Sequence, residues 1–230
     1  MATFVSLVNK VLTRLNEVNV DTAGDGFDSV RNVQALAKEA VNTAVRLIIQ
    51  DGQEWPFLKT TQTQVLVAGT SEYDFPDQVS SVDWETFYLK KSTSLGNSPT
   101  VLDPISYEEY IKSYRHIDDN DDTGSAPTKV YQTFEEKFGV TPKPNGAYEV
   151  EYVSWLFPSD MVEYNDTCII PNRFAHVITD GAMMIMMRFR SNEQSASIHQ
   201  KNFEDGIKAM RRVLMDDELV VRSTVISGRS

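Results

Sequence analysis

The feature that most constrains the fold is a change of pattern at Trp55-Pro56-Phe57, where helical periodicity stops and β-rich sequence begins. Pro56 disfavours helical geometry at Trp55, so the preceding helix is expected to end before this tripeptide. The rings of Trp55 and Phe57 are large enough to fill the space between a helical layer and a β layer. We therefore predict that Trp55, Pro56 and Phe57 form a packed corner with a structural role.

Two amphipathic helices are predicted before this corner, because apolar residues recur there at helical spacing. The first is expected to end ahead of the glycines in "NVDTAGDGFD". The second is expected to begin after Asp28, a suitable N-cap, and to stop near Gly52. The predicted apolar stripes are Phe4, Leu7, Val8, Val11, Leu12, Leu15 and Val18 in the first helix, and Val30, Val33, Ala37, Val41, Ala44 and Ile48 in the second.

The middle of the chain is rich in β-branched residues, alternating patterns and turn signals, which predict strands. The segments "TTQTQVLV" and "EYDFP" flank a turn and are expected to form a hairpin. Asn145-Gly146 is expected to make a second hairpin turn before the last strand. One short helix is predicted in "DPISYEEYIKSYR", where Ser106 and Glu109 have the spacing of a capping box.

After Pro158 helical patterns return, first around "GAMMIMMRF" and then from Ile198 to Leu214. A helix that is apolar around most of its circumference is either central in a bundle or covered by another chain. The sequence therefore predicts an α+β protein: a helical bundle built from both chain ends, an inserted antiparallel β region and an extended C-terminal arm. The expected boundaries are residues 1–59 and 159–215 for the bundle helices, 60–158 for the β-rich region and 216–230 for the arm.

The chain is acidic, with a net charge of −11, and the charge is unevenly placed. Residues 1–170 hold 13 basic and 26 acidic side chains, whereas residues 171–230 hold 9 and 7. An acidic chain is a poor tight binder of nucleic acid, although it suits a passage along which nucleic acid slides. The single cysteine, Cys168, the interleaved charges of the first residues and the lack of a long apolar run predict a soluble protein of a reducing compartment.

The acidic loop from His116 to Asp122 is the strongest candidate for a metal site. Counted from Asp119, it offers Asp121, Thr123 and Gly124 at calcium-loop positions, but Val130 stands where a bidentate glutamate is needed. A solvated acidic loop is therefore favoured, and Cys168, His176 and His199 match no zinc spacing. We predict no catalytic residue, no metal and no cofactor. The alternatives are a carboxylate- or metal-dependent enzyme around Asp119, or a general interaction module.

Residues 216–230 lie beyond the last predicted helical stripe and are rich in β-branched side chains. Such a segment is too short to fold alone and suits strand addition to another subunit. The residues that we predict to bind a partner are Leu219, Val221, Arg222, Val225, Ile226 and Arg229.

Several local motifs occur together in a recognisable order: W-x-F-L-x-x-T from Trp55, G-T-x-x-Y-x-x-P from Gly69, a strand that follows "GSAP", P-x-P from Pro142, and P-x-x-F from Pro171. In this order the chain resembles, over roughly residues 3–215, the podophage head-to-tail adaptor family of the tail tubular protein A type. The acidic loop around Asp119 and the residues after Met215 match no motif of that family.

The resemblance implies a virion structural protein without catalytic activity, made in the host cytoplasm before assembly. Members of the family form a ring of twelve copies below the portal, which continues the DNA channel used for genome ejection. The implied partners are the portal protein, the tail nozzle or tube protein, other copies of the chain, and double-stranded DNA that passes without sequence-specific binding; no membrane is involved. The C-terminal arm is expected to contact the portal or the neighbouring protomer.

Overall fold

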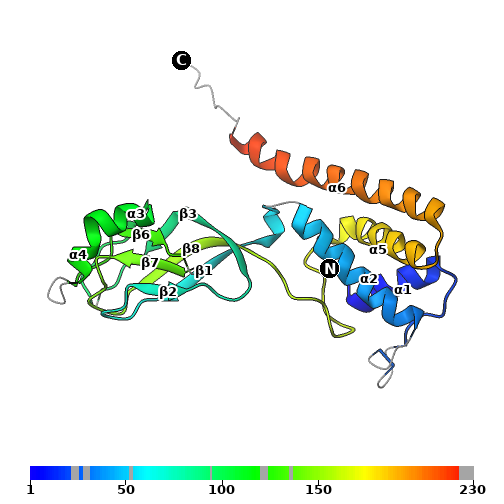
Figure 1. The fold of residues 1–230 in the computed structure, drawn as a ribbon, viewed down its shortest axis with the longest axis horizontal. Helices are drawn as coiled ribbons and strands as arrows, with labels where there is room; N and C mark the ends of the chain where they lie inside the picture. Colours follow the sequence, from blue (N-terminus) through cyan, green and yellow to red (C-terminus); the bar gives the residue numbers. More distant parts are fainter. Residues whose placement is uncertain are drawn as a thin grey trace, which may run out of the picture. The chain divides into compact units, whose positions relative to one another are not determined.

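The computed structural model describes residues 1–21, 26–27, 32–51, 54–93, 95–119, 124–134 and 137–222, with side chains described as far as Met215. The chain forms two compact units (Figure 1). The helical unit comprises Met1–Leu58 and Pro158–Ser230, and the β unit comprises Lys59–Phe157.

The helical unit brings together helices from both parts of the sequence. Its main helices are α1 (Phe4–Arg14), α2 (Val33–Asp51), α5 (Ala175–Phe189) and α6 (Glu193–Arg222), with short 3-10 turns η1 (Pro56–Leu58) and η4 (Asn172–Phe174). Helix α5 packs against α1, α2 and α6, and α1 also packs against α2 (Figure 1). The first and last parts of the chain therefore share one core.

The predicted stripe of α1 forms part of this core, since Phe4, Leu7, Val8, Val11 and Leu12 are all buried. Val18, by contrast, is 79% exposed, so its place in the stripe is wrong. The reason is local: α1 ends at Arg14, and Asn16 adopts a positive φ of 57°, which turns the chain out of the helix. The predicted N-cap of α2, Asp28, lies outside the described residues.

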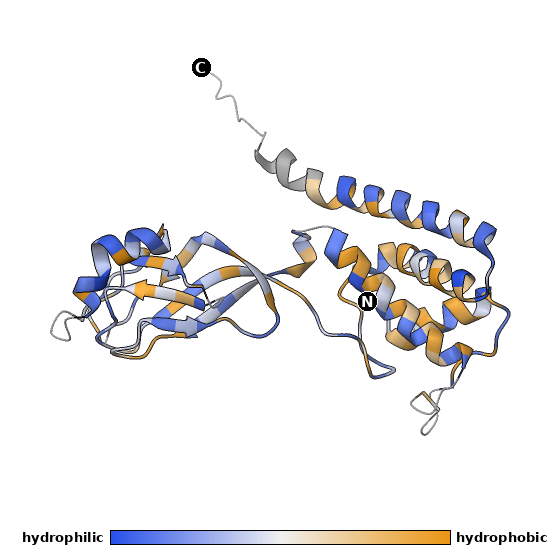
Figure 2. Ribbon diagram, viewed as in Figure 1, coloured by the Kyte–Doolittle hydropathy of each residue, from blue (hydrophilic) through white to orange (hydrophobic). Residues whose placement is uncertain are grey.

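The methionine-rich helix α5 is central in the helical unit. Met183, Met184 and Met186 are all buried. Of the two alternatives, a central place in the bundle and cover by another chain, the first therefore applies to these methionines. From Glu193 to Met215, helix α6 has polar and apolar residues interleaved (Figure 2). Its buried residues are Ala196, Phe203, Ile207 and Met210, spaced as one helical face. A methyl group at Gly181 would lie 2.7 Å from the Phe203 ring, so the glycine permits the close approach of α5 and α6.

Helix α6 runs on past Met215 and ends at Arg222, whereas the sequence pattern placed the start of the arm at residue 216. Residues 223–230 lie outside the described residues.

The β unit contains two four-stranded sheets. One has the order β1 (Lys59–Val65), β8 (Glu149–Leu156), β3 (Val79–Leu89) and β4 (Thr100–Val101); the other has the order β2 (Glu72–Asp74), β7 (Lys137–Thr141), β6 (Lys129–Gln132) and β5 (Asp103–Ile105). Aromatic rings contribute much of the core: the centroids of Phe87 and Tyr152 are 4.7 Å apart, and those of Phe87 and Phe138 are 5.4 Å apart.

Both predicted hairpins are wrong. Strand β1 pairs with β8 and β2 pairs with β7, so the turn at Gly69 connects the two sheets instead of two paired strands. The turn at Asn145-Gly146 likewise joins β7 of one sheet to β8 of the other. The region is also not wholly antiparallel, because β5 pairs with β6 in parallel. Turn residues predict where the chain bends, but they do not determine which strands pair. The pairing of β2 with β7 is selected by contacts between side chains, such as Tyr73 against Phe138.

The helical segment between β5 and β6 is divided into α3 (Tyr107–Glu109), the π turn η2 (Tyr110–Tyr114) and α4 (Arg115–Asp118). Its predicted N-cap is confirmed, because the Ser106 hydroxyl oxygen accepts a hydrogen bond from the Glu109 backbone N–H at 3.1 Å. This cap satisfies one of the free N–H groups at the start of the helix.

Candidate interaction surfaces

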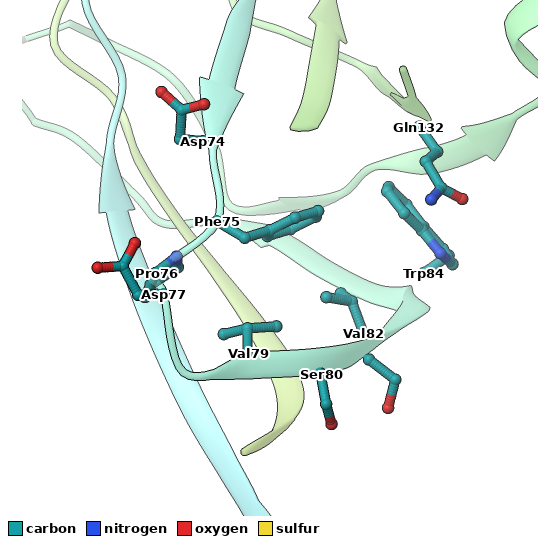
Figure 3. Close-up of a pocket in the computed structure, with 10 residues that line it drawn as sticks. Asp74, Phe75, Pro76, Asp77, Val79, Ser80, Val82, Trp84 and Gln132 are labelled. Atoms are coloured by element: carbon teal, nitrogen blue, oxygen red, sulfur yellow. The ribbon is translucent and has the colours of Figure 1, made fainter. Parts of the chain in front are cut away.

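The β unit has an open cavity of about 600 Å³ where the chain leaves β2 and enters β3 (Figure 3). Trp84 and Gln132 line it and also line a second cavity of about 570 Å³. We call the two cavities together the aromatic groove. Its aromatic and proline side chains are Phe75, Pro76, Trp84, Pro104, Tyr107 and Phe134.

The core of the β unit holds the rings of the groove in place. Phe75 follows β2 and meets Trp84 edge to face, with centroids 6.0 Å apart and planes at 74° (Figure 3). Trp84 stacks on buried Phe87 at 5.4 Å, and Phe75 lies 5.2 Å from buried Phe138. Phe75 and Trp84 are thus packed against the core and only partly buried, so they present aromatic surface to the groove.

Phe134 extends this surface at the turn between β6 and β7. It is 86% exposed, and its ring meets Tyr107 edge to face at 4.6 Å. Scattered apolar residues on a surface are ordinary, but contiguous aromatic surface beside a cavity is typical of an interaction site. The groove is therefore the candidate docking surface of the β unit.

Acidic side chains border the groove. Asp74 and Asp77 line its first cavity, and they lie on the opposite side of the view from Trp84 and Gln132 (Figure 3). The Asp74 carboxylate is 3.6 Å from the Lys137 ammonium, but the aspartate side chain is 82% exposed, so the pair leaves it accessible. The unit as a whole carries 16 acidic and 8 basic residues, which favours a cationic partner.

A buried tyrosine pair supports the segment that follows Tyr107. The rings of Tyr110 and Tyr131 stack with centroids 3.9 Å apart, and burial raises the pKa of both hydroxyls above the ordinary tyrosine value. Nearby, the buried Asp118 carboxylate accepts a hydrogen bond from the Lys143 backbone N–H at 2.8 Å. These contacts attach the short helical segment to the sheet.

The acidic loop does not have the framework of a calcium loop. Val130, at the last ligand position, lies in β6 opposite Val140 and has no exposed surface. Asp119 is exposed and forms a long ion pair of 3.9 Å with Arg115, while Asp121 and Thr123 lie outside the described residues. Where residues are described, no group of three potential His, Cys, Asp or Glu ligands is gathered.

Removal of divalent cations is expected to leave the melting temperature unchanged, because position 12 of the loop is a core valine. A thermal melt followed by circular dichroism, with and without a chelator, measures this. A drop of several degrees with the chelator, reversed by calcium or zinc, would contradict the prediction.

In the helical unit, Asp180 connects three helices. Its Oδ1 atom accepts hydrogen bonds from Arg14 at 2.9 Å and from the His199 ring at 3.2 Å. His199 thus forms a hydrogen bond between helices.

Cys168 is buried, which raises the pKa of its thiol, and His176 is exposed. Cys168 thus packs in the interior of the helical unit. A separate cavity of about 440 Å³ is lined by Lys10, Arg14 and His176, among others.

The predicted corner residues lie at the end of α2. Trp55 has no exposed surface; its indole N–H donates to the Ile48 carbonyl at 2.8 Å, and its ring stacks on Phe57 at 5.5 Å. Pro56 and Phe57 are half-buried in η1. These contacts lie within the helical unit, and the role of the three residues as a corner between helical and β layers stays a prediction.

The predicted partner-binding residues divide into two groups. Leu219, Val221 and Arg222 belong to the last turns of α6, where the backbone alone is described; Val225, Ile226 and Arg229 lie outside the described residues. Sequence reasoning missed the aromatic groove. The available signal was Phe134, an aromatic residue followed by Glu135-Glu136 at a turn, where burial in a core is unexpected.

Comparison with known proteins identifies a family that the chain matches. The model of the SU10 adaptor protein family matches residues 2–226, and no curated protein matches the chain. This is a phage head-to-tail adaptor family, so the resemblance found from sequence motifs is confirmed at that level. Membership implies oligomerisation, contact with portal and tail proteins, and a place in the virion. Among the described residues, no helix has the length and apolar character needed to span a bilayer. The chain therefore belongs to the SU10 adaptor protein family and is a structural protein of a phage head-to-tail junction.

Proposed function

We propose that the chain forms a ring of twelve copies that joins the portal to the tail nozzle or tube and continues the DNA channel for genome ejection. The observation that carries this proposal is the family match over residues 2–226, which includes both the helical unit and the β unit. The role is architectural, because each copy contributes surfaces to a junction and catalyses no reaction.

The charge of the chain supports passage of DNA without capture. With a net charge of −11, each copy has an excess of acidic side chains, which opposes tight binding of phosphates. Double-stranded DNA that meets an acidic wall is repelled and slides, which is what ejection of a genome requires. Sequence-specific contacts to bases have no part in this function.

The proposed junction is tested by measuring mass in solution with and without the purified portal protein. We expect a complex with portal whose mass matches a closed ring of twelve adaptor copies, and a cryo-electron microscopy view that shows a continuous axial channel. A chain that remains monomeric in the presence of portal would overturn the proposal.

The C-terminal segment is proposed to bind a partner in this assembly through Leu219, Val221, Arg222, Val225, Ile226 and Arg229. Deleting residues 216–230 is expected to leave the protein folded but unable to assemble onto portal-bearing heads. Circular dichroism and cosedimentation with such heads measure the two effects. Normal assembly of the truncated chain would contradict the prediction.

A second truncation, of residues 223–230, serves as the matched variant because α6 ends at Arg222. It keeps the whole helix and removes only the residues that follow it. Equal loss of assembly in both truncations assigns partner binding to the last eight residues.

A further inference from the structure

The aromatic groove has the chemistry to bind an extended, cationic and aliphatic segment. Its floor presents the partly buried rings of Phe75 and Trp84, and the exposed ring of Phe134 continues this surface. Aliphatic side chains gain by covering such rings, and a guanidinium gains both by lying over an aromatic face and by pairing with the carboxylates of Asp74 and Asp77. An acidic or strongly polar segment would gain neither.

The last eight residues of the chain, "STVISGRS", have the complementary composition. They contain the aliphatic residues Val225 and Ile226 and the cation Arg229, and they contain no acidic residue. Fully extended, eight residues span about 26–29 Å. The β unit, with its net negative charge, provides the opposite sign.

The other chain terminus is already engaged within the helical unit. Thr3 forms a bridge with Thr167, the Phe4 backbone N–H donates to the Asp166 carbonyl at 2.8 Å, and the Phe4 side chain has no exposed surface. Among the ends of the chain, the C-terminal segment is therefore the one that matches the groove.

We propose that the aromatic groove of one copy binds residues 223–230 of a second copy. In an extended segment Val225 and Arg229 lie on the same side, so Val225 covers the aromatic rings of the groove while Arg229 pairs with the carboxylate border. The choice of a second copy rests on the proposed ring, since copies that exchange their C-terminal segments around a ring bind one another in a closed cycle. The groove and the segment are thus the two halves of one interface between copies.

Photo-crosslinking in the full-length protein tests this pairing. Phe134 is replaced by benzoylphenylalanine, which keeps an aromatic ring at an exposed position, and equal amounts of ¹⁴N- and ¹⁵N-labelled chains are mixed before assembly. Mass spectrometry is expected to find crosslinks from position 134 to residues 223–230 of the oppositely labelled chain. The same photoreactive residue in place of Phe189, which is 66% exposed in the helical unit, is the matched control and is expected to give none to this segment.

Two further variants change the segment and leave the folded units intact. Val225→Ser with Ile226→Ser is expected to reduce the crosslink at least tenfold, and Arg229→Glu is expected to reduce it similarly, with partial recovery when combined with Asp77→Lys. Crosslinks confined to chains of the same label, or absent from residues 223–230, would overturn the proposal. The mass of the assembly is measured on the same samples. A ring that forms without the crosslink would contradict only this pairing, whereas failure to assemble with portal would contradict the proposed junction.

Discussion

Replacing Trp55 with alanine is expected to lower the free energy of unfolding of the helical unit by about 3–5 kcal/mol, the usual cost of removing a buried tryptophan. The Trp55 side chain has no exposed surface and stacks on Phe57. Its indole N–H also donates to the carbonyl of Ile48, in the last turns of α2. The last four carbonyls of a helix lack partners within the helix, so the substitution removes both apolar burial and a terminating hydrogen bond.

Chemical denaturation followed by the helical circular dichroism signal measures this effect. Trp55→Phe is the control, because it keeps an aromatic ring in the site while it loses the N–H donor and part of the buried surface; we expect it to cost about 1–2 kcal/mol. A Trp55→Ala protein that unfolds at the wild-type denaturant concentration would show that the side chain is dispensable for packing.

Local sequence pattern predicted the helices of this protein well, because helix formation depends on residues that are close in sequence. The stripe from Phe4 to Leu12 is buried, and the Ser106 cap forms as its spacing indicates. The errors lie at helix ends. Val18 fits the period of the stripe but follows a turn at Asn16, and α6 continues beyond residue 215 to Arg222. Periodicity identifies a packed face, but it does not determine where the backbone leaves the helix.

Strand pairing could not be predicted in the same way. The segments of β1 and β2 lie on either side of a turn, yet each finds its partner far along the chain, in β8 and β7 respectively. Partner choice depends on how the apolar faces of all the strands combine in one core, where rings such as Phe87, Phe138 and Tyr152 meet. A single sequence gives the faces of the strands but not their combination.

The aromatic groove was beyond sequence reasoning for the same reason. Phe75, Trp84 and Phe134 come from the end of β2, the middle of β3 and the turn after β6, and only the two-sheet topology brings them to neighbouring cavities. The sequence did contain the other half of the proposed interface. Its β-branched composition alone predicts that the C-terminal segment 216–230 binds a partner, and the last eight of these residues contain no acidic side chain.

Gly139 shows how one residue in a strand can be fixed by its cross-strand neighbour. It lies directly opposite Tyr131 in the antiparallel pair of β6 and β7, and the tyrosine ring lies over it. A methyl group at Gly139 would be 2.1 Å from Cζ of Tyr131, far inside van der Waals contact. The ring has no space to move away, since it is fully buried and stacked on Tyr110 at 3.9 Å. A glycine inside a strand often marks such a close approach.

Gly139→Ala is therefore expected to destabilise the β unit by about 3 kcal/mol, the upper end of the usual cost of overpacking. Denaturation followed by tryptophan fluorescence, which reports on Trp84 and Trp155 in this unit, measures the loss. Gly124→Ala is the matched control, because its added methyl group would meet Asn145 Cβ at 3.4 Å, an ordinary contact, and we expect little change. Combining Gly139→Ala with Tyr131→Leu removes the clashing ring, so the two costs should sum to more than the cost of the double variant. Wild-type stability of Gly139→Ala alone would show that Tyr131 is free to move and that the stacked tyrosine pair does not hold this part of the sheet.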